Sequence, residues 1–272
     1  MIADVDGRET SGLEARALCV SYGGNVAVSG ASLTAPLGRI TGLIGPNGAG
    51  KTTTFNACNG LVRPTSGSVL LGGRDVTRVG TASRARLGMG RTFQQVQVCT
   101  GMSVRANVAL GAEIALIGRN PLRQFAGGRG QRQVVAERTD AALETCGIGR
   151  LADASVTVLS TGQRRLVELA RVLASGYQML LLDEPSSGLD ETETAHFGEI
   201  LTGVVAERGV GMLLVEHDMS LVMKVCTYIY VLDFGNMIFE GTPAEVRASS
   251  QVRAAYLGEE DGLAAVAGEA TS

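Results

Sequence analysis

The sequence predicts an α/β fold, with a mainly parallel β-sheet that helices cover on both faces. Short apolar runs alternate with helical patterns along most of the chain, and a glycine-rich loop joins one of these runs to a helix. Apolar residues make up 45% of the 272 residues, which is enough for a sizeable core. These observations exclude a chain that is disordered over most of its length.

The first half of the chain contains three kinds of element. Residues 13–37 are expected to form short strands separated by glycine turns, in an antiparallel sheet of modest size. Residues 39–44 predict a buried strand that leads into the glycine-rich loop and then into a helix that begins near Lys51. Residues 66–76 predict a hairpin.

The second half of the chain begins with a helical region. Residues 101–174 have a mostly helical pattern, interrupted by an arginine-rich, glycine-containing insert near residues 119–132. Two apolar runs, 179–182 and 212–215, predict buried strands, and residues 228–239 predict a hairpin. We expect the strand at 179–182 to lie directly beside the strand that leads into the glycine-rich loop.

Composition excludes several classes of function. A formal net charge of -3 and a pI of about 5.5 argue against a protein that coats nucleic acid, and no nucleic-acid partner is expected. The five cysteines form no CxxC pair and are odd in number, which argues against a disulfide framework or a zinc site. No stretch approaches the roughly 20 apolar residues of a membrane-spanning helix. The first ten residues lack a signal-peptide core, so we expect a cytoplasmic chain.

A phosphate-binding loop is the clearest motif. The pattern GxxxxGK[ST] is matched in full, and its residues are Gly45, Pro46, Asn47, Gly48, Ala49, Gly50, Lys51 and Thr52. Glycines let backbone N–H groups approach an anion without interference from Cβ, and the helix start adds positive potential. Lys51, one of only two lysines in the chain, is expected to hold the β- and γ-phosphates. The Thr52 hydroxyl is expected to bind Mg²⁺, and Thr53 is assigned to the same nucleotide site.

Two acidic residues end the apolar run at 179–182. Asp183 is placed to hold Mg²⁺ through water, because it follows directly on a buried strand. Glu184 is placed to polarise the attacking water as a general base. The pair therefore predicts hydrolysis of a bound nucleotide.

A third motif, LSTGQ at residues 159–163, precedes an amphipathic helix. Ser160 can cap this helix, and Gly162 lets the backbone approach a ligand closely. The motif therefore predicts a second helix start that binds an anion.

The order of these motifs resembles the ATP-binding cassette (ABC) family over residues 13–258. The resemblance implies an α/β P-loop NTPase fold, in which a RecA-like core carries an antiparallel β subdomain and an inserted helical subdomain. It implies one ATPase domain at 12–258. Within it, 12–95 and 177–258 form the nucleotide-binding core and 96–176 forms the helical subdomain with the signature. Residues 259–272 are expected to be an acidic, flexible tail.

The resemblance also implies roles for residues outside the phosphate loop. Tyr22 matches the aromatic residue that stacks on adenine, and Gln94 matches the glutamine that reaches Mg²⁺ and the attacking water. His217 matches the switch histidine that contacts the γ-phosphate. The cofactors implied are ATP and Mg²⁺. The loop that communicates across a dimer is Ser187, Gly188, Leu189 and Asp190.

One chain holds one phosphate loop and one signature, so the resemblance implies a homodimer or a heterodimer with a paralogous ATPase. The signature residues would contact the ATP held by the other subunit, and they are Ser160, Thr161, Gly162 and Gln163. Thr161 departs from the family's commonest signature, which has glycine there. Further partners implied are integral membrane permease subunits, which would hold the chain on the inner face of the membrane, and indirectly a substrate-binding protein.

Within the family, the chain most resembles the ATPase subunits of branched-chain amino acid importers. The likeness rests on Arg91–Gln94, the arginine-rich insert, Val215–Met219 and Arg253–Glu259. Lipopolysaccharide-export ATPases are the nearest alternative, and non-transport ABC ATPases are another. The insert is interpreted either as a solvated loop or as a contact with lipid headgroups or the permease. Residues 94–100 are expected to dock a permease helix.

Overall fold

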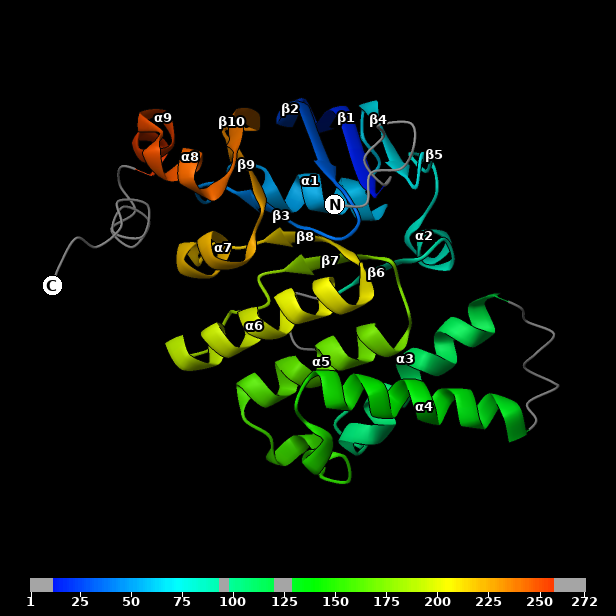
Figure 1. Cartoon of the computed structure of the whole chain (residues 1–272). Coiled ribbons are helices and arrows are strands. Elements are labelled where there is room, and N and C mark those ends of the chain that lie inside the picture. The colour runs from blue at the N-terminus through cyan, green and yellow to red at the C-terminus, as the bar shows by residue number, and fades with distance from the viewer. Residues whose placement is uncertain (1–11, 93–97, 120–128, 257–272) are drawn as a thin grey trace, which may run out of the picture.

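The computed structural model describes residues 12–92, 98–119 and 129–256, and it is an α/β fold with two sheets (Figure 1). The four-stranded sheet is antiparallel, in the order β2 (Asn25–Ala35), β1 (Leu13–Tyr22), β4 (Ser66–Leu71), β5 (Arg74–Asp75). The six-stranded sheet has the order β10 (Asn236–Gly241), β9 (Tyr228–Asp233), β3 (Ile40–Ile44), β8 (Gly211–Val215), β7 (Met179–Asp183), β6 (Met89–Arg91). All neighbours in it are parallel except β10 and β9.

The helices cover both faces of the six-stranded sheet. On one side lies α1 (Lys51–Asn59), packed between the two sheets (Figure 1). On the other side lie α6 (Glu191–Arg208) and α7 (Met219–Val225), and beyond them α3 (Val104–Arg119), α4 (Arg129–Thr145) and α5 (Thr161–Ala174). The remaining helices are α2 (Thr81–Arg86), α8 (Pro243–Ala248), α9 (Ser250–Ala255) and the short 3₁₀ turns η2 (Gly149–Leu151) and η3 (Val156–Val158).

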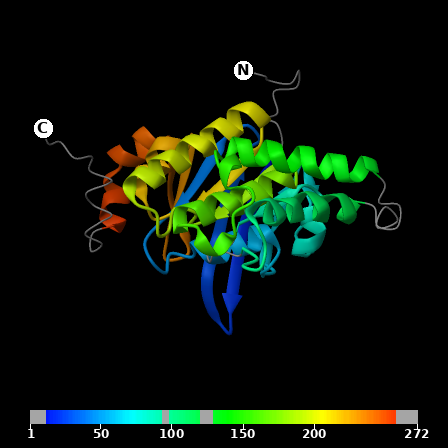
Figure 2. The same cartoon turned by 90° about the horizontal axis from the view of Figure 1, so that it is seen from below.

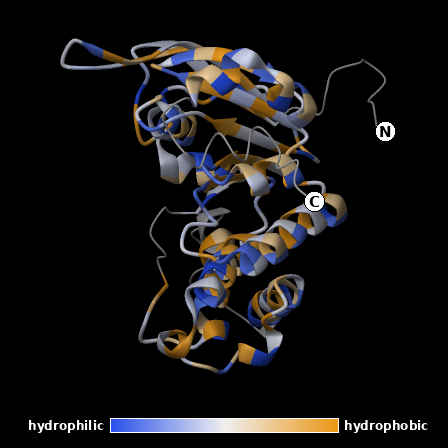
Figure 3. Ribbon diagram, turned by 90° about the vertical axis from the view of Figure 1, so that its left-hand side faces the viewer, coloured by the Kyte–Doolittle hydropathy of each residue, from blue (hydrophilic) through white to orange (hydrophobic). Residues whose placement is uncertain are grey.

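The central strands are buried on both faces, as their continuous apolar runs predict. Along β8, Met212 and Leu214 point into the core beneath α6 and α7, whereas Leu213 and Val215 point towards α1. Successive side chains alternate between the faces because the period of a strand is two. Figure 3 shows apolar residues along these strands, between the layers.

The expected position of the strand that carries the acidic pair is wrong. β7 does not lie beside β3, because β8 is inserted between them and pairs with both. Each β8 residue is fully buried or nearly so, which suits the middle of a sheet rather than an edge. The consequence is that the end of β8 lies between the phosphate loop and the acidic pair.

The expectation of several short strands in residues 13–37 is also wrong. β1 and β2 are long strands that form one hairpin, which projects from the body (Figures 2 and 3). Gly30 does not end a strand: it lies inside β2 with φ of 69°, where the pairing with β1 shifts in register. A bulge of this kind absorbs an extra residue without ending the ladder. The hairpins predicted at 66–76 and 228–239 are confirmed as β4–β5 and β9–β10.

Helices α3, α4 and α5 pack together as a separate layer (Figures 1 and 2). At Gly111 the backbone of α3 lies directly against that of α5, since a Cβ there would be 2.0 Å from the carbonyl oxygen of Arg171. Two predicted segments, the middle of the insert (120–128) and the tail (259–272), lie outside the described residues. Across the described ranges, none of the helices has the length and apolarity needed to cross a membrane.

Candidate functional site

Three strand ends meet at one edge of the six-stranded sheet. Leu43 of β3 and Asp183 of β7 both pair with Val215 of β8, so the three strands end level with one another. The residues that follow each strand therefore project from the same edge. In open parallel sheets, ligands bind at this carboxyl edge.

The phosphate loop follows β3 and is held tightly from two sides. Gly45 has φ of 149°, and a Cβ there would lie 2.0 Å from the carbonyl oxygen of Leu232 in β9. Gly50 has φ of 100°, and its Cβ would lie 2.7 Å from the carbonyl oxygen of Ala27. Only glycine fits both the backbone conformation and the space at these positions.

Lys51 is the first residue of α1 and is almost buried, at 8% exposure. Its Nζ donates hydrogen bonds to the carbonyl oxygens of Gly45 and Pro46, at 2.5 and 2.9 Å. The ammonium group thus lies over the loop, at a helix start whose first turn carries no acidic residue. Both features favour an anion at this point.

A pocket of about 360 Å³ joins the phosphate loop to Glu184, whereas Asp183 does not line it. Seven of the predicted nucleotide residues line it, namely Asn47, Gly48, Ala49, Gly50, Lys51, Thr52 and Thr53. Glu184, from the end of β7, lines the same pocket. Residues that lie more than 130 positions apart in the chain are brought together because β3 and β7 end at the same edge.

Asp183 is the last residue of β7 and is 2% exposed. Burial raises the pKa of its carboxyl group, and the guanidinium of Arg91, with Nη2 3.3 Å from Oδ2, acts in the opposite direction. Arg91 is held in turn by Asn56 Oδ1 at 3.0 Å and by the ring of Phe55, 4.9 Å below its Cζ. Arg91 therefore opposes the effect of burial on the pKa of this carboxyl group.

Glu184 has a left-handed backbone, with φ of 47°. Non-glycine residues rarely adopt this conformation, and residues in such sparsely populated backbone regions cluster at active sites and ligand clamps. The N–H of Glu184 donates to the carbonyl oxygen of Val215 at 2.8 Å, which holds the turn against β8. The turn directs this residue into the pocket.

The residues present fit a magnesium ion. Of the three predicted ligands, Gln94 lies outside the described residues. The other two, the hydroxyl of Thr52 and the carboxylate of Asp183, are hard oxygen donors of the kind that Mg²⁺ prefers. Within the described ranges there is no cluster of three or more His, Cys, Asp and Glu side chains that could hold a metal alone. A magnesium ion here would accordingly depend on the phosphates for further ligands, as is usual at nucleotide sites.

His217 follows β8 and has a side chain that is 62% exposed. It is not among the residues that line the pocket. Its backbone N–H donates to Oε2 of Glu216 at 3.2 Å. Glu216 is fully buried, and the sequence pattern does not indicate a role for its carboxylate.

The signature residues lie apart from the pocket, at the start of α5. Ser160 is the N-cap of α5 and forms a reciprocal capping box with Gln163. Thr161 begins the helix. Gly162 faces Glu193 of α6, whose Oε1 would lie 2.5 Å from a Cβ at this position. None of these signature residues lines the pocket in the described part of the chain.

The loop Ser187–Asp190 connects the acidic pair to α6. Asp190 caps α6 and forms a capping box with Glu193. Gly188 has φ of 82° and lies against the side chain of Thr161. This loop, including the partly buried Leu189, therefore links the acidic end of β7 to the signature helix of the same chain.

For two predicted site residues, Tyr22 and Gln94, the assigned role stays a prediction. Tyr22 lies at the end of β1, where it pairs with Asn25 of β2 next to the hairpin turn, is 52% exposed, and does not line the pocket. Its role in stacking stays a prediction. Gln94 lies outside the described residues, as does most of the predicted docking segment at 94–100.

Four residues of the pocket were not indicated by the sequence. They come from the start of β2 and from the β9–β10 turn, and they are Val26, Ala27, Phe234 and Gly235. The N–H of Gly235 donates to the carbonyl oxygen of Ala49 at 2.9 Å, which fastens this turn to the phosphate loop. The only available signal was the glycine turn itself, because the pairing of β9 with β3 spans most of the chain.

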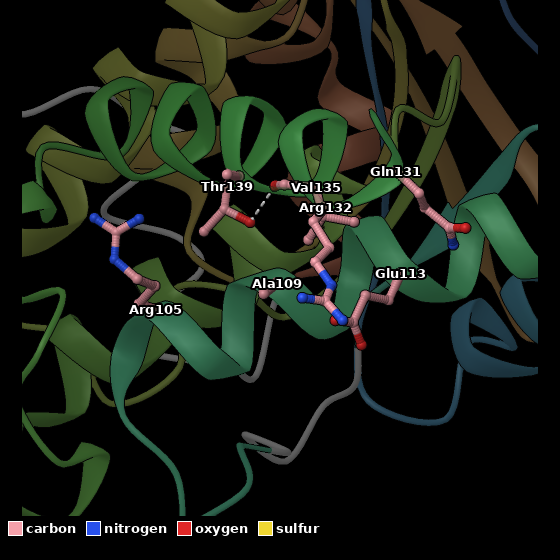
Figure 4. Close-up of a pocket in the computed structure, with 8 residues that line it drawn as sticks. Arg105, Ala109, Glu113, Gln131, Arg132, Val135 and Thr139 are labelled. Atoms are coloured by element: carbon pink, nitrogen blue, oxygen red, sulfur yellow. Dashed lines mark hydrogen bonds between the residues drawn. The ribbon is translucent and has the colours of Figure 1, made fainter. Parts of the chain in front are cut away.

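A second pocket of about 370 Å³ lies between α3 and α4 (Figure 4). Arg105, Glu113 and Arg132 are at its rim, and Thr139 Oγ1 donates to the carbonyl oxygen of Val135 at 2.7 Å. It shares no residue with the first pocket. The two pockets are therefore separate.

Comparisons with known proteins agree with this geometry. The family described as ABC transporter matches residues 28–187, and the family described as branched-chain amino acid ATP-binding cassette transporter matches residues 236–262. A probable ABC transporter ATP-binding protein of Azorhizobium caulinodans is 38% identical over 248 residues, which cover 91% of this chain and 83% of that one.

Two further relatives differ in the transport that their names describe. The high-affinity branched-chain amino acid transport ATP-binding protein BraF of Pseudomonas aeruginosa is 35% identical, over 91% of this chain and 98% of its own. The lipopolysaccharide export system ATP-binding protein LptB of Haemophilus influenzae is 36% identical over the same shares. The two identities are too close to choose a cargo.

Solved structures show the same fold. The cbiO1 structure from Clostridium perfringens, part of the ABC transporter complex cbiONQ, has a TM-score of 0.78 and 28% identity, over 93% of this chain and 96% of that one. The ADP conformation of an ATP-binding cassette of an ABC transporter has a TM-score of 0.79 and 28% identity, over 91% and 98%.

Proposed function

We propose, because this chain belongs to the ABC transporter family and is an ATP-hydrolysing subunit of it, that ATP closes a dimer of two such chains and that hydrolysis opens it. One observation carries the proposal. The phosphate loop and Glu184 line one pocket, whereas the signature residues lie outside it. The second anion-binding helix start must then come from another chain.

The residues divide the work of hydrolysis. Lys51 and the backbone N–H groups of the loop hold the β- and γ-phosphates, and His217 holds the γ-phosphate. Thr52 and Asp183 would hold Mg²⁺, which supplies positive charge to the phosphate oxygens. The oxygen of a water molecule attacks the γ-phosphorus, Glu184 accepts the proton of that water, and the bond to the ADP oxygen breaks.

The second chain contributes its signature and its Ser187–Asp190 loop. In the closed dimer, the N-termini of two helices, α1 of one chain and α5 of the other, would face one γ-phosphate. Loss of that phosphate removes the charge that holds the chains together. The second chain is identical or a paralogue, and both are held at the inner face of the membrane by permease subunits. No nucleic acid takes part.

The proposed cargo is a branched-chain amino acid or a similar small polar or amphipathic solute, delivered to the permease by a substrate-binding protein. The family match at 236–262 supports this cargo. The alternative is export of a lipid or lipopolysaccharide, which the 36% identity to LptB favours. A non-transport ABC ATPase would need no permease.

Transport with the chain's own permease tests the cargo. The chain is purified together with its membrane partners, and uptake of labelled leucine into vesicles or cells is measured with wild type and with Glu184→Gln. We expect ATP-dependent leucine uptake by wild type and none by the variant. ATP hydrolysis without leucine uptake, accompanied by co-purified lipopolysaccharide, would favour the export alternative. Failure to co-purify with any membrane protein would contradict a transport role.

A further inference from the structure

A buried carboxylate lies between the proposed catalytic groups. Glu216 follows the last residue of β8 and is fully buried. Its Oε1 accepts hydrogen bonds from the N–H and the hydroxyl of Ser186, at 2.8 and 2.7 Å. Its Oε2 accepts the N–H of His217 at 3.2 Å. One side chain thus holds the backbone of two separate loops.

Ser186 is the point at which the acidic loop is fixed. It lies two residues after Glu184, is 5% exposed, and accepts the N–H of Leu189 on its carbonyl oxygen at 3.0 Å. The N–H of Ser187 donates in turn to the carbonyl oxygen of Glu184 at 3.2 Å. The position of Ser186 therefore determines the path of the whole segment from the general base to the start of α6.

Burial of Glu216 is costly. Desolvation raises the pKa of its carboxyl group, and the bonds from Ser186 and the proximity of His217 oppose this shift. A buried ionised group commonly contributes less to stability than a neutral residue of the same shape. The hydrogen bonds accepted by both carboxyl oxygens join the two loops that follow β7 and β8, which an apolar residue of the same shape could not do.

We propose that Glu216 is a positioning residue, which fixes Glu184 and His217 relative to each other by binding Ser186 on one side and the backbone of His217 on the other. This inference rests on the proposed function. Glu216 does not line the nucleotide pocket, so it acts on turnover and not on the affinity for ATP. A misplacement of about 1 Å in a catalytic group can lower a rate a hundredfold.

The test measures Mg–ATP hydrolysis, binding of a fluorescent ATP analogue, and thermal unfolding of the full chain. We expect Glu216→Ala to lower kcat about a hundredfold and Glu216→Gln about tenfold, with nucleotide affinity within about twofold of wild type. Glutamine can still accept the two bonds of Ser186, but its amide group cannot accept the N–H of His217. The melting temperature of Glu216→Gln should fall, because the buried amide group and the N–H of His217 then face each other as two donors.

A double substitution separates positioning from general damage. Ser186→Ala keeps the backbone N–H and loses only the hydroxyl bond, so we expect kcat to fall about threefold. If Glu216 acts through Ser186, Glu216→Ala combined with Ser186→Ala should be no slower than Glu216→Ala alone. The matched control is Glu199→Gln, which should behave as wild type. Glu199 is an exposed glutamate on α6 that pairs with Lys224 of α7.

Each outcome is decisive. A Glu216→Gln variant with a lower melting temperature and an unchanged kcat would make Glu216 a purely structural residue and overturn the inference. Additive losses in the double variant would also contradict it. If Glu216→Ala does not fold, Glu216→Gln and Ser186→Ala decide. If wild type itself does not hydrolyse ATP, the proposed function fails and this inference fails with it.

Discussion

Glu184 combines two features that a solvated surface acid does not need. Its backbone has a φ of 47°, and its N–H is held by Val215 while the residue lines the pocket with Lys51 and Thr52. The strained turn is stabilised by the strand ends around it. Lys51, by contrast, places a nearly buried ammonium group at the start of α1, where we propose that it neutralises the charge of the phosphates.

We expect these two residues to give different defects. Glu184→Gln should bind nucleotide normally but lower turnover at least about a hundredfold, because the amide cannot accept the proton of the water. Lys51→Ala should weaken nucleotide binding at least about tenfold, because a charge-assisted contact is lost. Binding of a fluorescent nucleotide and release of phosphate distinguish the two. Normal hydrolysis by Glu184→Gln would disprove the general-base assignment.

A buried arginine supports the helix that follows the phosphate loop. Arg84 of α2 has no exposed surface, and its guanidinium donates to five backbone carbonyls, those of Ala57, Cys58, Val76, Thr77 and Val79. Ala57 and Cys58 belong to the last turn of α1, where carbonyls have no partner within the helix. Burial lowers the pKa of Arg84, and the electrostatic effects of Cys58 and Asp75 act in the opposite direction.

Arg84→Met should therefore destabilise the protein by roughly 3 kcal/mol, because several buried carbonyls lose their donor. Urea unfolding followed by circular dichroism measures the change. Arg86→Met, at an exposed arginine on the same helix, is the control and should change stability by less than about 0.5 kcal/mol. Equal effects of the two substitutions would show that the carbonyl contacts contribute nothing.

Residue patterns predict the site better where the chemistry is local in sequence. The phosphate loop and the capping of α5 by Ser160 follow from contiguous residues, and the structure places them as such local rules require. Phe234 and Glu216 could not be found in this way. Their places depend on β9 and β8 flanking β3, a pairing that no local pattern encodes.

At the scale of elements, strand and helix types are predictable from periodicity, whereas neighbours are not. The runs at 179–182 and 212–215 are both continuous and apolar, so nothing in them tells which one pairs with β3. Similarly, a glycine such as Gly30 is typical of a turn, but here it lies within the long ladder of β1 and β2, where the register shifts at a bulge. Long-range pairing decides both cases.

The contact between α3 and α5 depends on a missing side chain. Gly111→Ala should destabilise the protein by roughly 2 kcal/mol, because a Cβ would lie against the backbone of Arg171. Gly203→Ala in α6 is the matched control, since a Cβ there meets nothing within 4 Å. It should stabilise the protein by about 0.5–1 kcal/mol through helix propensity. Chemical denaturation compares the two, and the same sign for both would contradict the close packing.

For the whole molecule, the separation of the phosphate loop from the signature makes complementation possible. Lys51→Ala removes the charge of one half-site, and Gly162→Asp places a negative charge at the other. Each variant alone should be inactive. Mixed together, half of the dimers hold one complete site of two, so about a quarter of wild-type hydrolysis should return.

The control for this experiment is one variant mixed with itself. Two samples of Lys51→Ala, mixed at the same total concentration, should remain inactive. Recovery that depends on both variants would support a head-to-tail dimer. No recovery, although sedimentation shows that mixed dimers form, would contradict a site shared between chains.

The place of β8 has a consequence for movement. A strand bonded along both sides cannot slide without breaking two ladders at once, so the spacing between the phosphate loop and Glu184 is set by the width of the sheet. Neither cargo nor permease can tune hydrolysis by stretching that interval. Under the proposed function, we expect control to come from outside this rigid frame, through the approach and withdrawal of the neighbouring subunit.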